Sequence, residues 1–432
     1  MSARAERNTG GDPGAPAPAS RASMVTATFS TVVEWYDFTL YLYFATVLSR
    51  VFFGEGAASL ATALAGFAVA YLLRPLGALV FGRIGDRFGR RRMMLGSMAL
   101  MGAAMLATAL LPTRAVAGPA AGWLLLGLRC VMSFSVGGEY TGVVAYLLES
   151  AGPRRRGLVA SCASAASEVG GLLAVGVSAL TVHALSERDL AAWGWRLPFL
   201  LGAALAAAVW VARSSMDESP EFARQVAAGT TPERPLRHVW AHHRAGVARS
   251  FAISALGSIT YYVGITYVPT FLASAGSLGE AEALGLSTAA AVVVILVTPA
   301  VGALSDRWGR KPVLLGLAAC SAVLPATLFA LMGGASAAGA LSGAVVLAAV
   351  AGGVSAVGAA ATAEQFPGEG RLTGLALGAT AATALFGGVT PWLAQLLTRS
   401  TGWPGAPGAM IAVVALAVAP VLALAPETRP RR

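Results

Sequence analysis

The sequence predicts an all-α membrane protein with twelve transmembrane helices, arranged as two pseudo-symmetric bundles of six. Of its 432 residues, 56% are hydrophobic and only 12% are charged, whereas about a quarter of the residues of a soluble domain are charged. The charged residues cluster, leaving long uncharged stretches, and one motif of the first half recurs in the second half. This pattern excludes a soluble globular enzyme, a disordered chain and a coiled coil.

The uncharged stretches have the length of membrane spans. A bilayer core of about 30 Å is crossed by a helix of roughly 20 apolar residues. Backbone in lipid must satisfy its own hydrogen bonds, so these spans must be helices. The predicted helices of the first half are 25–50, 57–81, 93–112, 119–148, 157–182 and 195–213. Those of the second half are 248–273, 282–303, 313–333, 338–362, 372–397 and 405–425.

The remaining segments define the predicted domains and the topology. Residues 1–24 are expected to form a disordered tail, 214–247 a central loop between bundles 25–213 and 248–425, and 426–432 a short C-terminus. With both termini in the cytoplasm, 24 of the 31 basic residues lie in cytoplasmic segments, as the positive-inside rule favours. The net charge of +10 therefore indicates topology in a multi-pass inner-membrane protein, and no nucleic-acid partner is expected.

Reactive and metal-binding motifs are not recognised in the sequence. The three cysteines (Cys130, Cys162 and Cys320) lie in apolar runs without the spacing of a disulfide framework or a metal site. Nothing resembles a nucleotide-binding loop, a catalytic triad or a zinc site. We therefore expect no metal, no cofactor and no enzymatic activity.

An internal repeat relates the two halves. Residues 82–96 read GRIGDRFGRRRMMLG and residues 302–316 read GALSDRWGRKPVLLG, with seven identities at an offset of 220. Parallel six-helix repeats are one architecture of secondary transporters. Charge-assisted bonds at these loops could lock one conformation, although positive-inside charge alone would also explain the arginines. A second, looser repeat has the seven-residue spacing of Glu149 and Arg156. The predicted lock residues are Asp86, Arg87, Arg90, Glu149, Arg156, Asp306, Arg307 and Arg310.

The repeated loop, G-x-x-x-D-R-x-G-R-[KR], resembles the signature of the major facilitator superfamily. The stretches EWYDF (34–38), RPLGALVFGRIGDRFGRRR (74–92), FSVGGEYTG (134–142), WGWRLPF (193–199) and DESPEF (217–222) resemble its metabolite:proton symporter family. Within it, SITYYVGITYVPTFL (258–272) and Glu168 are most similar to the proline/betaine transporters. The resemblance extends from about residue 25 to residue 425, and it implies the major facilitator fold and proton-coupled uptake of a metabolite.

Ionisable residues inside a membrane cost about 2.5–3.5 kcal/mol each and are functional candidates by default. Glu34, Asp37 and Tyr41 have i, i+3, i+7 spacing, which places them on one stripe of the first helix. Two carboxyl groups that close repel each other, so that one of them can hold a proton. We expect Glu34, Asp37 or Glu139 to couple transport to protons. A static ion pair of one of these acids with Arg74 or Arg129 is the alternative.

The expected substrate-binding residues are Arg129, Glu168, Tyr41, Tyr140, Tyr261 and Tyr262. A buried guanidinium can hold a carboxylate by two hydrogen bonds, although Arg129 could instead neutralise Asp37 or Glu139. Glu168 could attract an ammonium group or bond a neighbouring helix. Tyrosine faces suit quaternary ammonium ions, but tyrosines also anchor helices at the interface.

These observations predict a proton-coupled secondary symporter that works as a monomer by alternating access. Its expected substrate is a small zwitterionic or carboxylated metabolite, with proline or glycine betaine favoured. Uptake of a di- or tricarboxylate or another organic acid, and proton-driven efflux by an antiporter, are the alternatives.

Overall fold

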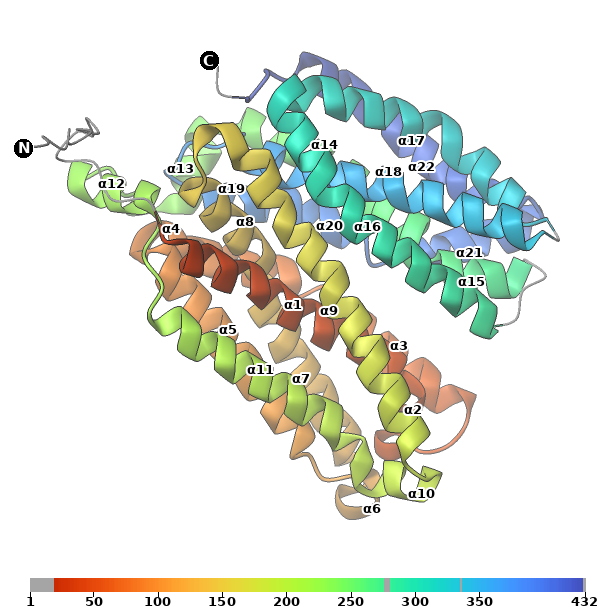
Figure 1. Ribbon diagram of the computed structural model, residues 1–432. Coiled ribbons are helices and arrows are strands. Elements are labelled where there is room, and N and C mark those ends of the chain that lie inside the picture. The colour runs from red at the N-terminus through yellow and green to blue at the C-terminus, as the bar shows by residue number, and fades with distance from the viewer. Residues whose placement is uncertain (1–18, 276–279, 335, 430–432) are drawn as a thin grey trace, which may run out of the picture.

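The computed structural model describes residues 19–275, 280–334 and 336–429, and these residues form helices joined by short connections. Figure 1 shows two helical bundles, one from α1 to α11 and the other from α14 to α22. Of the predicted N-terminal tail, residues 1–18 lie outside the described residues. Residues 21–24 already belong to the first helix, which begins at Arg21 after the N-cap Ser20.

The first bundle contains six long helical segments, several of them interrupted. In chain order its elements are α1 (Arg21–Tyr43), α2 (Ala45–Phe52), α3 (Ala57–Tyr71), α4 (Arg74–Phe88), α5 (Arg90–Ala109), α6 (Arg114–Ala117), α7 (Ala120–Val136), α8 (Glu139–Ser150), η1 (Pro153–Arg155), α9 (Arg156–Ala184), α10 (Glu187–Asp189), η2 (Leu190–Gly194) and α11 (Arg196–Ser214). The repeated motif is more helical than expected, because only Gly89 separates α4 from α5.

The second bundle repeats this plan. Its elements are α14 (Arg244–Tyr261), η3 (Tyr262–Thr266), α15 (Val268–Ala275), α16 (Glu280–Trp308), α17 (Arg310–Met332), α18 (Ala337–Ala363), α19 (Arg371–Leu375), η4 (Ala376–Thr380), α20 (Ala381–Phe386), α21 (Thr390–Thr401) and α22 (Ala406–Leu424). Between the bundles, the expected central loop contains two short helices, α12 (Pro220–Ala228) and α13 (Pro235–His242). Both begin with proline, a residue suited to the first helical position.

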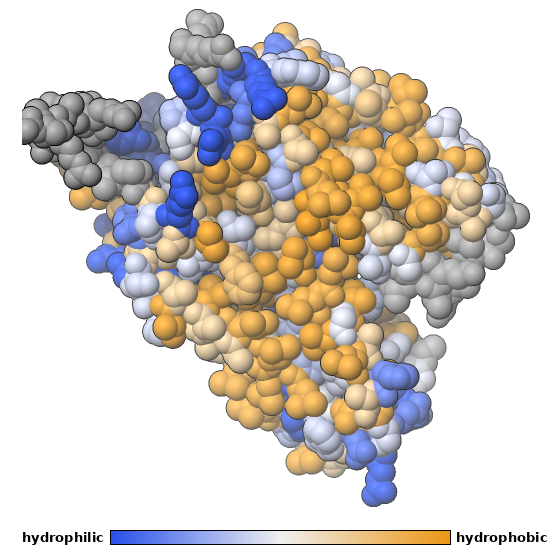
Figure 2. Space-filling view, viewed as in Figure 1, coloured by the Kyte–Doolittle hydropathy of each residue, from blue (hydrophilic) through white to orange (hydrophobic). Residues whose placement is uncertain are grey.

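In the described residues, ten helices are long and apolar enough to cross a membrane. The two other predicted spans, 25–50 and 248–273, are also helical, as α1–α2 and as α14–η3–α15. Charged and polar residues such as Glu34, Asp37 and Arg249 lower their hydropathy. Figure 2 shows a broad hydrophobic surface over both bundles, with hydrophilic residues gathered towards the ends of the molecule.

The bundles meet along α9, which packs against α16 and α18, and along α4, which packs against α19. One buried cluster crosses this boundary at the end of the molecule that carries residues 82–92 and 302–312, which we name the motif end. There Met93 and Tyr146 of the first bundle share a core with Phe366 and Leu372 of the second. The opposite end, which carries α6 and α10, is named the far end.

Candidate functional site

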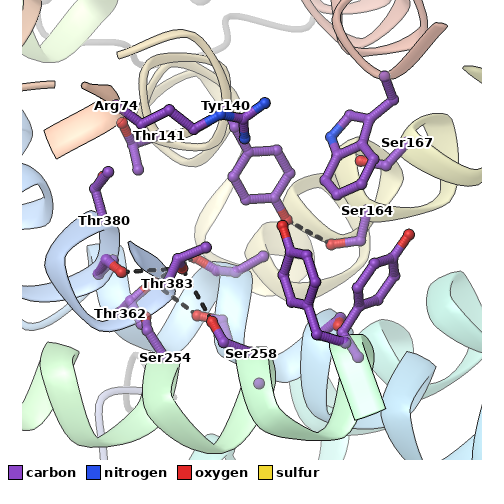
Figure 3. A pocket seen from close by; sticks show the side chains of 18 of the residues that line it. Arg74, Tyr140, Thr141, Ser164, Ser167, Ser254, Ser258, Thr362, Thr380 and Thr383 are labelled. Carbon is purple, nitrogen blue, oxygen red and sulfur yellow. Dashed lines mark hydrogen bonds between the residues drawn. The ribbon is translucent and has the colours of Figure 1, made fainter. Parts of the chain in front are cut away.

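A cavity of about 180 Å³ lies between the two bundles. It is lined by residues of α1, α3, α4, α7, α8 and α9 from the first bundle and of α14, η3, α16, α18, η4 and α20 from the second. Figure 3 shows Arg74, Tyr140 and Ser164 on one side of it, with Ser258 and Thr383 on the other. An apolar cavity of about 150 Å³ holds benzene, so this cavity has the size for a small metabolite.

Three ionisable side chains line the cavity without an ion pair to any described residue: Glu34, Arg74 and Glu168. Each also has a buried polar atom without a hydrogen-bond partner, namely Glu34 Oε2, Arg74 Nε and Glu168 Oε1. The Arg74 guanidinium lies over the rings of Tyr71 and Phe38, at 4.6 and 4.9 Å from their centres. Buried polar atoms are rarely unsatisfied, and because all three residues line the cavity, a ligand bound there could supply the partners.

Aromatic side chains form one wall of the cavity. The rings of Trp35 and Tyr261 lie 5.5 Å apart, and Tyr261 also interacts with the Glu168 carboxylate. The Tyr262 hydroxyl lies 2.7 Å from the Tyr71 hydroxyl, and the Tyr140 hydroxyl bonds Ser164, also at 2.7 Å. Glu168 and Tyr261 together make a carboxylate beside an aromatic face, a combination that attracts an ammonium group.

Interruptions of the long helices position several of these side chains. Arg74 is the first residue of α4, directly after the turn that ends α3, and Pro75 follows it. Tyr262 begins the π-helical turn η3, and Thr380 ends the π-helical turn η4. Single π-turns in α-helices are frequent at functional sites, and broken helices at the repeat interface form the binding sites of many transporters.

Asp37 and Arg129 form a buried ion pair outside the cavity. Arg129 donates two hydrogen bonds to Asp37, of 2.8 and 3.3 Å, and both side chains are 3% exposed. Tyr41 donates to the Ala63 carbonyl, and its ring stacks on Phe67. The expectation that Arg129 and Tyr41 contact the substrate is therefore corrected. The Arg129 guanidinium is paired with Asp37, which is the static ion pair that the sequence offered as an alternative. Neither Arg129 nor Tyr41 lines the cavity.

Glu139 forms a second buried pair, with Arg213 of α11. Ser97 also donates to Glu139, while Arg213 donates to Ser30 and to the Met94 carbonyl. Arg213 was not predicted, because a basic residue at the end of a span fits the positive-inside rule. Its position as the last residue of the predicted span 195–213 was the available signal. Of the expected site residues, Glu34, Tyr140, Glu168, Tyr261 and Tyr262 line the cavity, whereas Asp37 and Glu139 do not.

At the motif end, Asp86 of α4 binds the other bundle. Its carboxylate accepts hydrogen bonds from the backbone N–H groups of Leu372 and Thr373, of 3.1 and 2.8 Å. Arg90 donates to Asp86 at 3.2 Å. The side chains of Asp86 and Arg90 are fully buried, so these bonds fasten α4 and α5 to α19.

Glu149 extends this network. It accepts from Arg90 of its own bundle at 2.9 Å and from Arg371 of the other bundle at 2.7 Å. Arg90 also donates to the Gly368 carbonyl across the same boundary. Glu149 thus receives a cation from each half.

The second copy of the motif makes the mirrored set of contacts. Asp306 accepts from the backbone N–H groups of Gly157 and Leu158 in the first bundle, at 2.8 and 2.9 Å. Arg310 donates to Asp306 at 2.9 Å and to Glu364 at 3.2 Å. Each half therefore binds the backbone of the other through the aspartate of its motif.

Three of the expected lock residues contribute less. The side chains of Arg87 and Arg307 are exposed, and each follows its aspartate by one residue, roughly 100° around the helix. Neither side chain forms a hydrogen bond or ion pair with a described residue of the opposite bundle, and their placement in the lock is corrected to positive-inside charge. Arg156 is attracted electrostatically by Glu364 but makes no hydrogen bond to a described residue.

Each motif is also capped by a carboxylate from a later segment. Glu218 accepts from the N–H groups of Arg90 and Arg91, at 2.9 and 3.2 Å, where α5 begins. Burial raises the pKa of Glu218, and these N–H donors oppose the rise. Glu427 accepts in the same way from Arg310 and Lys311 at the start of α17, at 2.9 and 3.0 Å.

The glycine before each of these helices is required by its conformation. Gly89 and Gly309 both have φ of 109°, a region that residues with a Cβ rarely adopt. A Cβ at Gly89 would lie 2.2 Å from a Glu218 oxygen, and one at Gly309 would lie 2.5 Å from a Glu427 oxygen.

Comparison with known proteins agrees with this architecture. Residues 23–231 match the family model described as sugar (and other) transporter, and residues 275–432 match the major facilitator superfamily model. The chain is 32% identical to the alpha-ketoglutarate permease of Escherichia coli, over 87% of each chain. It is 33% identical to an ectoine/proline transporter of Corynebacterium glutamicum, over 86% of this chain and 77% of the relative.

Two further similarities concern a third relative and a solved structure. A citrate-proton symporter of Klebsiella pneumoniae is 30% identical, over 91% of this chain and 89% of the relative. The solved structure of the proton:xylose symporter XylE superposes with a TM-score of 0.75 at 20% identity, over 94% and 96% of the two chains.

The family models, the relatives and the membrane-spanning helices together define a multi-pass membrane transporter rather than an enzyme. The chain belongs to the major facilitator superfamily, among the metabolite transporters that include these relatives. The predicted fold class is thereby confirmed.

Proposed function

We propose that this protein is a proton-coupled importer of a small zwitterion, with proline and glycine betaine as the favoured substrates. The observation that supports this most is the arrangement of charge around the cavity. Arg74 offers an unpaired guanidinium, which binds carboxylates through parallel hydrogen bonds. Glu168, Trp35 and Tyr261 offer a carboxylate and aromatic faces, which suit an ammonium group. The ectoine/proline transporter among the relatives is consistent with such a substrate.

The transport cycle follows from the contacts at the two ends. We place the motif end and both termini in the cytoplasm of a plasma-membrane protein, because the basic residues gather there. Breaking the Asp86 and Asp306 contacts would separate the bundles at that end and open the cavity to the cytoplasm. At the far side of the cavity, the hydrogen bond between Tyr71 and Tyr262 would break when the cavity opens outward. A monomer contains all of these parts.

Uptake of an organic acid is the second candidate, supported by the relatives that carry alpha-ketoglutarate and citrate. Hydroxyl groups on the second bundle could hydrogen-bond additional carboxylate oxygens, for example those of Ser258 and Thr383. Against it, Arg74 is the only cationic side chain among the described residues that line the cavity. Glu168 would repel a second carboxylate by about 1 kcal/mol or more. A small cavity with charged walls also gives less support to an efflux antiporter of bulky apolar compounds.

Uptake into proteoliposomes tests the substrate class. The purified protein would be given labelled proline, glycine betaine, alpha-ketoglutarate (2-oxoglutarate) and citrate, each with and without an inward proton gradient. We expect proline or betaine to accumulate, and only when the gradient is present. If only 2-oxoglutarate or citrate accumulates, the substrate is an organic acid and not a zwitterion. Accumulation without a gradient would contradict proton coupling.

The variant Glu168→Gln tests the ammonium half of the site. It should weaken uptake of proline or betaine tenfold or more, the equivalent of about 1.4 kcal/mol, and should change uptake of a purely anionic substrate little. Glu55→Gln, at an exposed position outside the cavity, is the matched control. Equal zwitterion uptake by both variants would remove Glu168 from the site.

A further inference from the structure

We propose that Glu34 is the proton-coupling carboxyl group, and that it acts by competing with the carboxylate of the substrate for Arg74. This inference rests on the proposed function only in requiring a substrate that carries a carboxylate. It selects one of the three acids that the sequence offers for proton coupling.

Two of those three acids already have cationic partners. Asp37 is held by two hydrogen bonds from Arg129, and Glu139 is paired with Arg213. Neither lines the cavity. Glu34 lines it, is only 2% exposed, and has no ion pair with a described residue. Its Oε2 atom is buried without a hydrogen-bond partner. Glu34 is therefore the acid whose charge depends most on what occupies the cavity.

Among the groups around Glu34, one cation has no carboxylate partner and can bind an incoming substrate. The charged and titratable groups around it come from α4, α8, α9, α11 and η3: Arg74, Glu139, Tyr140, Glu168, Arg213 and Tyr262, with Asp37 on its own helix. Arg213 is neutralised by Glu139, and the hydroxyls of Tyr140 and Tyr262 are bonded to Ser164 and Tyr71. Arg74 is the uncommitted cation among these groups.

A single guanidinium cannot fully neutralise two carboxylates in a cavity of this size. In the empty transporter at alkaline pH, the positive charge of Arg74 compensates an ionised Glu34. When a substrate carboxylate binds Arg74 bidentately, Glu34 would become a buried charge without a counter-ion, which is costly. Glu34 then takes a proton from the outer water and becomes a neutral carboxyl. After the substrate leaves towards the cytoplasm, Glu34 releases that proton and faces Arg74 again. One proton therefore moves with each substrate molecule.

The test combines substrate affinity with proton counting. Binding of labelled proline to the purified protein would be measured across pH, and proton uptake would be followed with an indicator dye in weak buffer. For the wild type, we expect affinity to fall about tenfold per pH unit on the alkaline side, with one proton taken up per proline bound. In Glu34→Gln, affinity should not change with pH, and proton uptake should be lost. Exchange across proteoliposomes should persist, while gradient-driven accumulation disappears.

Glu168→Gln is the matched control, since it makes the same substitution on the other unpaired acid of the same cavity. It should lower the affinity for proline tenfold or more while keeping both the pH slope and the proton uptake. The proposal is overturned if Glu34→Gln keeps its pH slope or its proton uptake.

Two additions keep this test decisive. If Glu34→Gln does not fold, the double variant Asp37→Asn/Arg129→Gln must still take up one proton per substrate, and loss of that proton would also overturn the proposal. The same measurements with 2-oxoglutarate and citrate separate this inference from the substrate assignment. Binding of these acids but not of proline would refute the zwitterion. A flat pH response in Glu34→Gln with the same acids would still support Glu34.

Discussion

At the scale of single residues, three arginines within the first bundle differ in what balances their charge. Arg129 and Arg213 each have a carboxylate partner, whereas Arg74 has the faces of two aromatic rings. A cation–π contact supplies only about 0.5–2 kcal/mol, so Arg74 keeps most of its capacity to bind an anion. The paired arginines are expected to stabilise the bundle, and Arg74 to bind substrate.

Removing one partner of a buried pair should show this difference. In Asp37→Asn, Arg129 is left as a buried cation without its counter-ion, which should lower the free energy of unfolding by about 3–5 kcal/mol. Thermal unfolding of the purified protein would measure the loss. The double variant Asp37→Asn/Arg129→Gln should recover most of it. A fully stable Asp37→Asn that cannot accumulate substrate would instead make Asp37 the proton carrier.

At the scale of elements, the junction of α4 and α5 combines a cap with a contact between bundles. Gly89 allows the turn, Glu218 caps α5, and Asp86 binds the N–H groups at the start of α19. The junction is therefore stable within its own bundle, while its bonds to the other bundle can break as a unit. Such a division suits a rigid-body transition.

Asp86→Asn should loosen the motif end. Asparagine keeps the size of the side chain but weakens two charge-assisted bonds, each worth about 1.5–3 kcal/mol. The opening would be followed through a single cysteine, Thr362→Cys, in a protein from which the native cysteines have been removed. Thr362 lies on the cavity wall, two residues before Glu364. Its labelling rate by a membrane-impermeant maleimide should rise roughly tenfold. Arg87→Gln, one residue away and exposed, should leave labelling unchanged. Equal labelling rates in the two variants would show that the motif acts only through its positive-inside charge.

The sequence allowed the helices and the acidic residues of the motifs to be predicted, because both depend on patterns along one chain. It did not show which buried arginine faces the cavity. Arg74 and Arg129 both interrupt apolar runs, and the rotation of each helix depends on the neighbours against which it packs. Arg213 was hidden by its position at the end of a span. The caps by Glu218 and Glu427 depend on contacts between segments distant in sequence.

At the scale of the whole molecule, the two halves fasten each other reciprocally. Asp86 of the first half binds backbone of the second, and Asp306 of the second half binds backbone of the first. The boundary at the motif end is therefore closed from both sides by equivalent contacts, and opening it requires both sets to break.

This symmetry predicts that the second aspartate has the same effect as the first. Asp306→Asn should raise the labelling of Thr362→Cys by a factor similar to that of Asp86→Asn. Because the two sites share no partner residue, their effects should combine additively in free energy. Arg307→Gln, at an exposed position, serves as the control. If Asp306→Asn left the labelling rate unchanged, only the contacts of Asp86 would hold the motif end closed.

The matching carboxylates at the motif end also differ between the halves in their spacing along the chain. Asp86 and Asp306 are 220 residues apart, Glu149 and Glu364 are 215 apart, and Glu218 and Glu427 are 209 apart. If both halves descend from one duplicated ancestral unit, the connecting segments of the two copies changed length independently after the duplication. Selection then preserved the meeting points in space rather than the spacing along the chain, while residues 82–96 and 302–316 still match at a single offset.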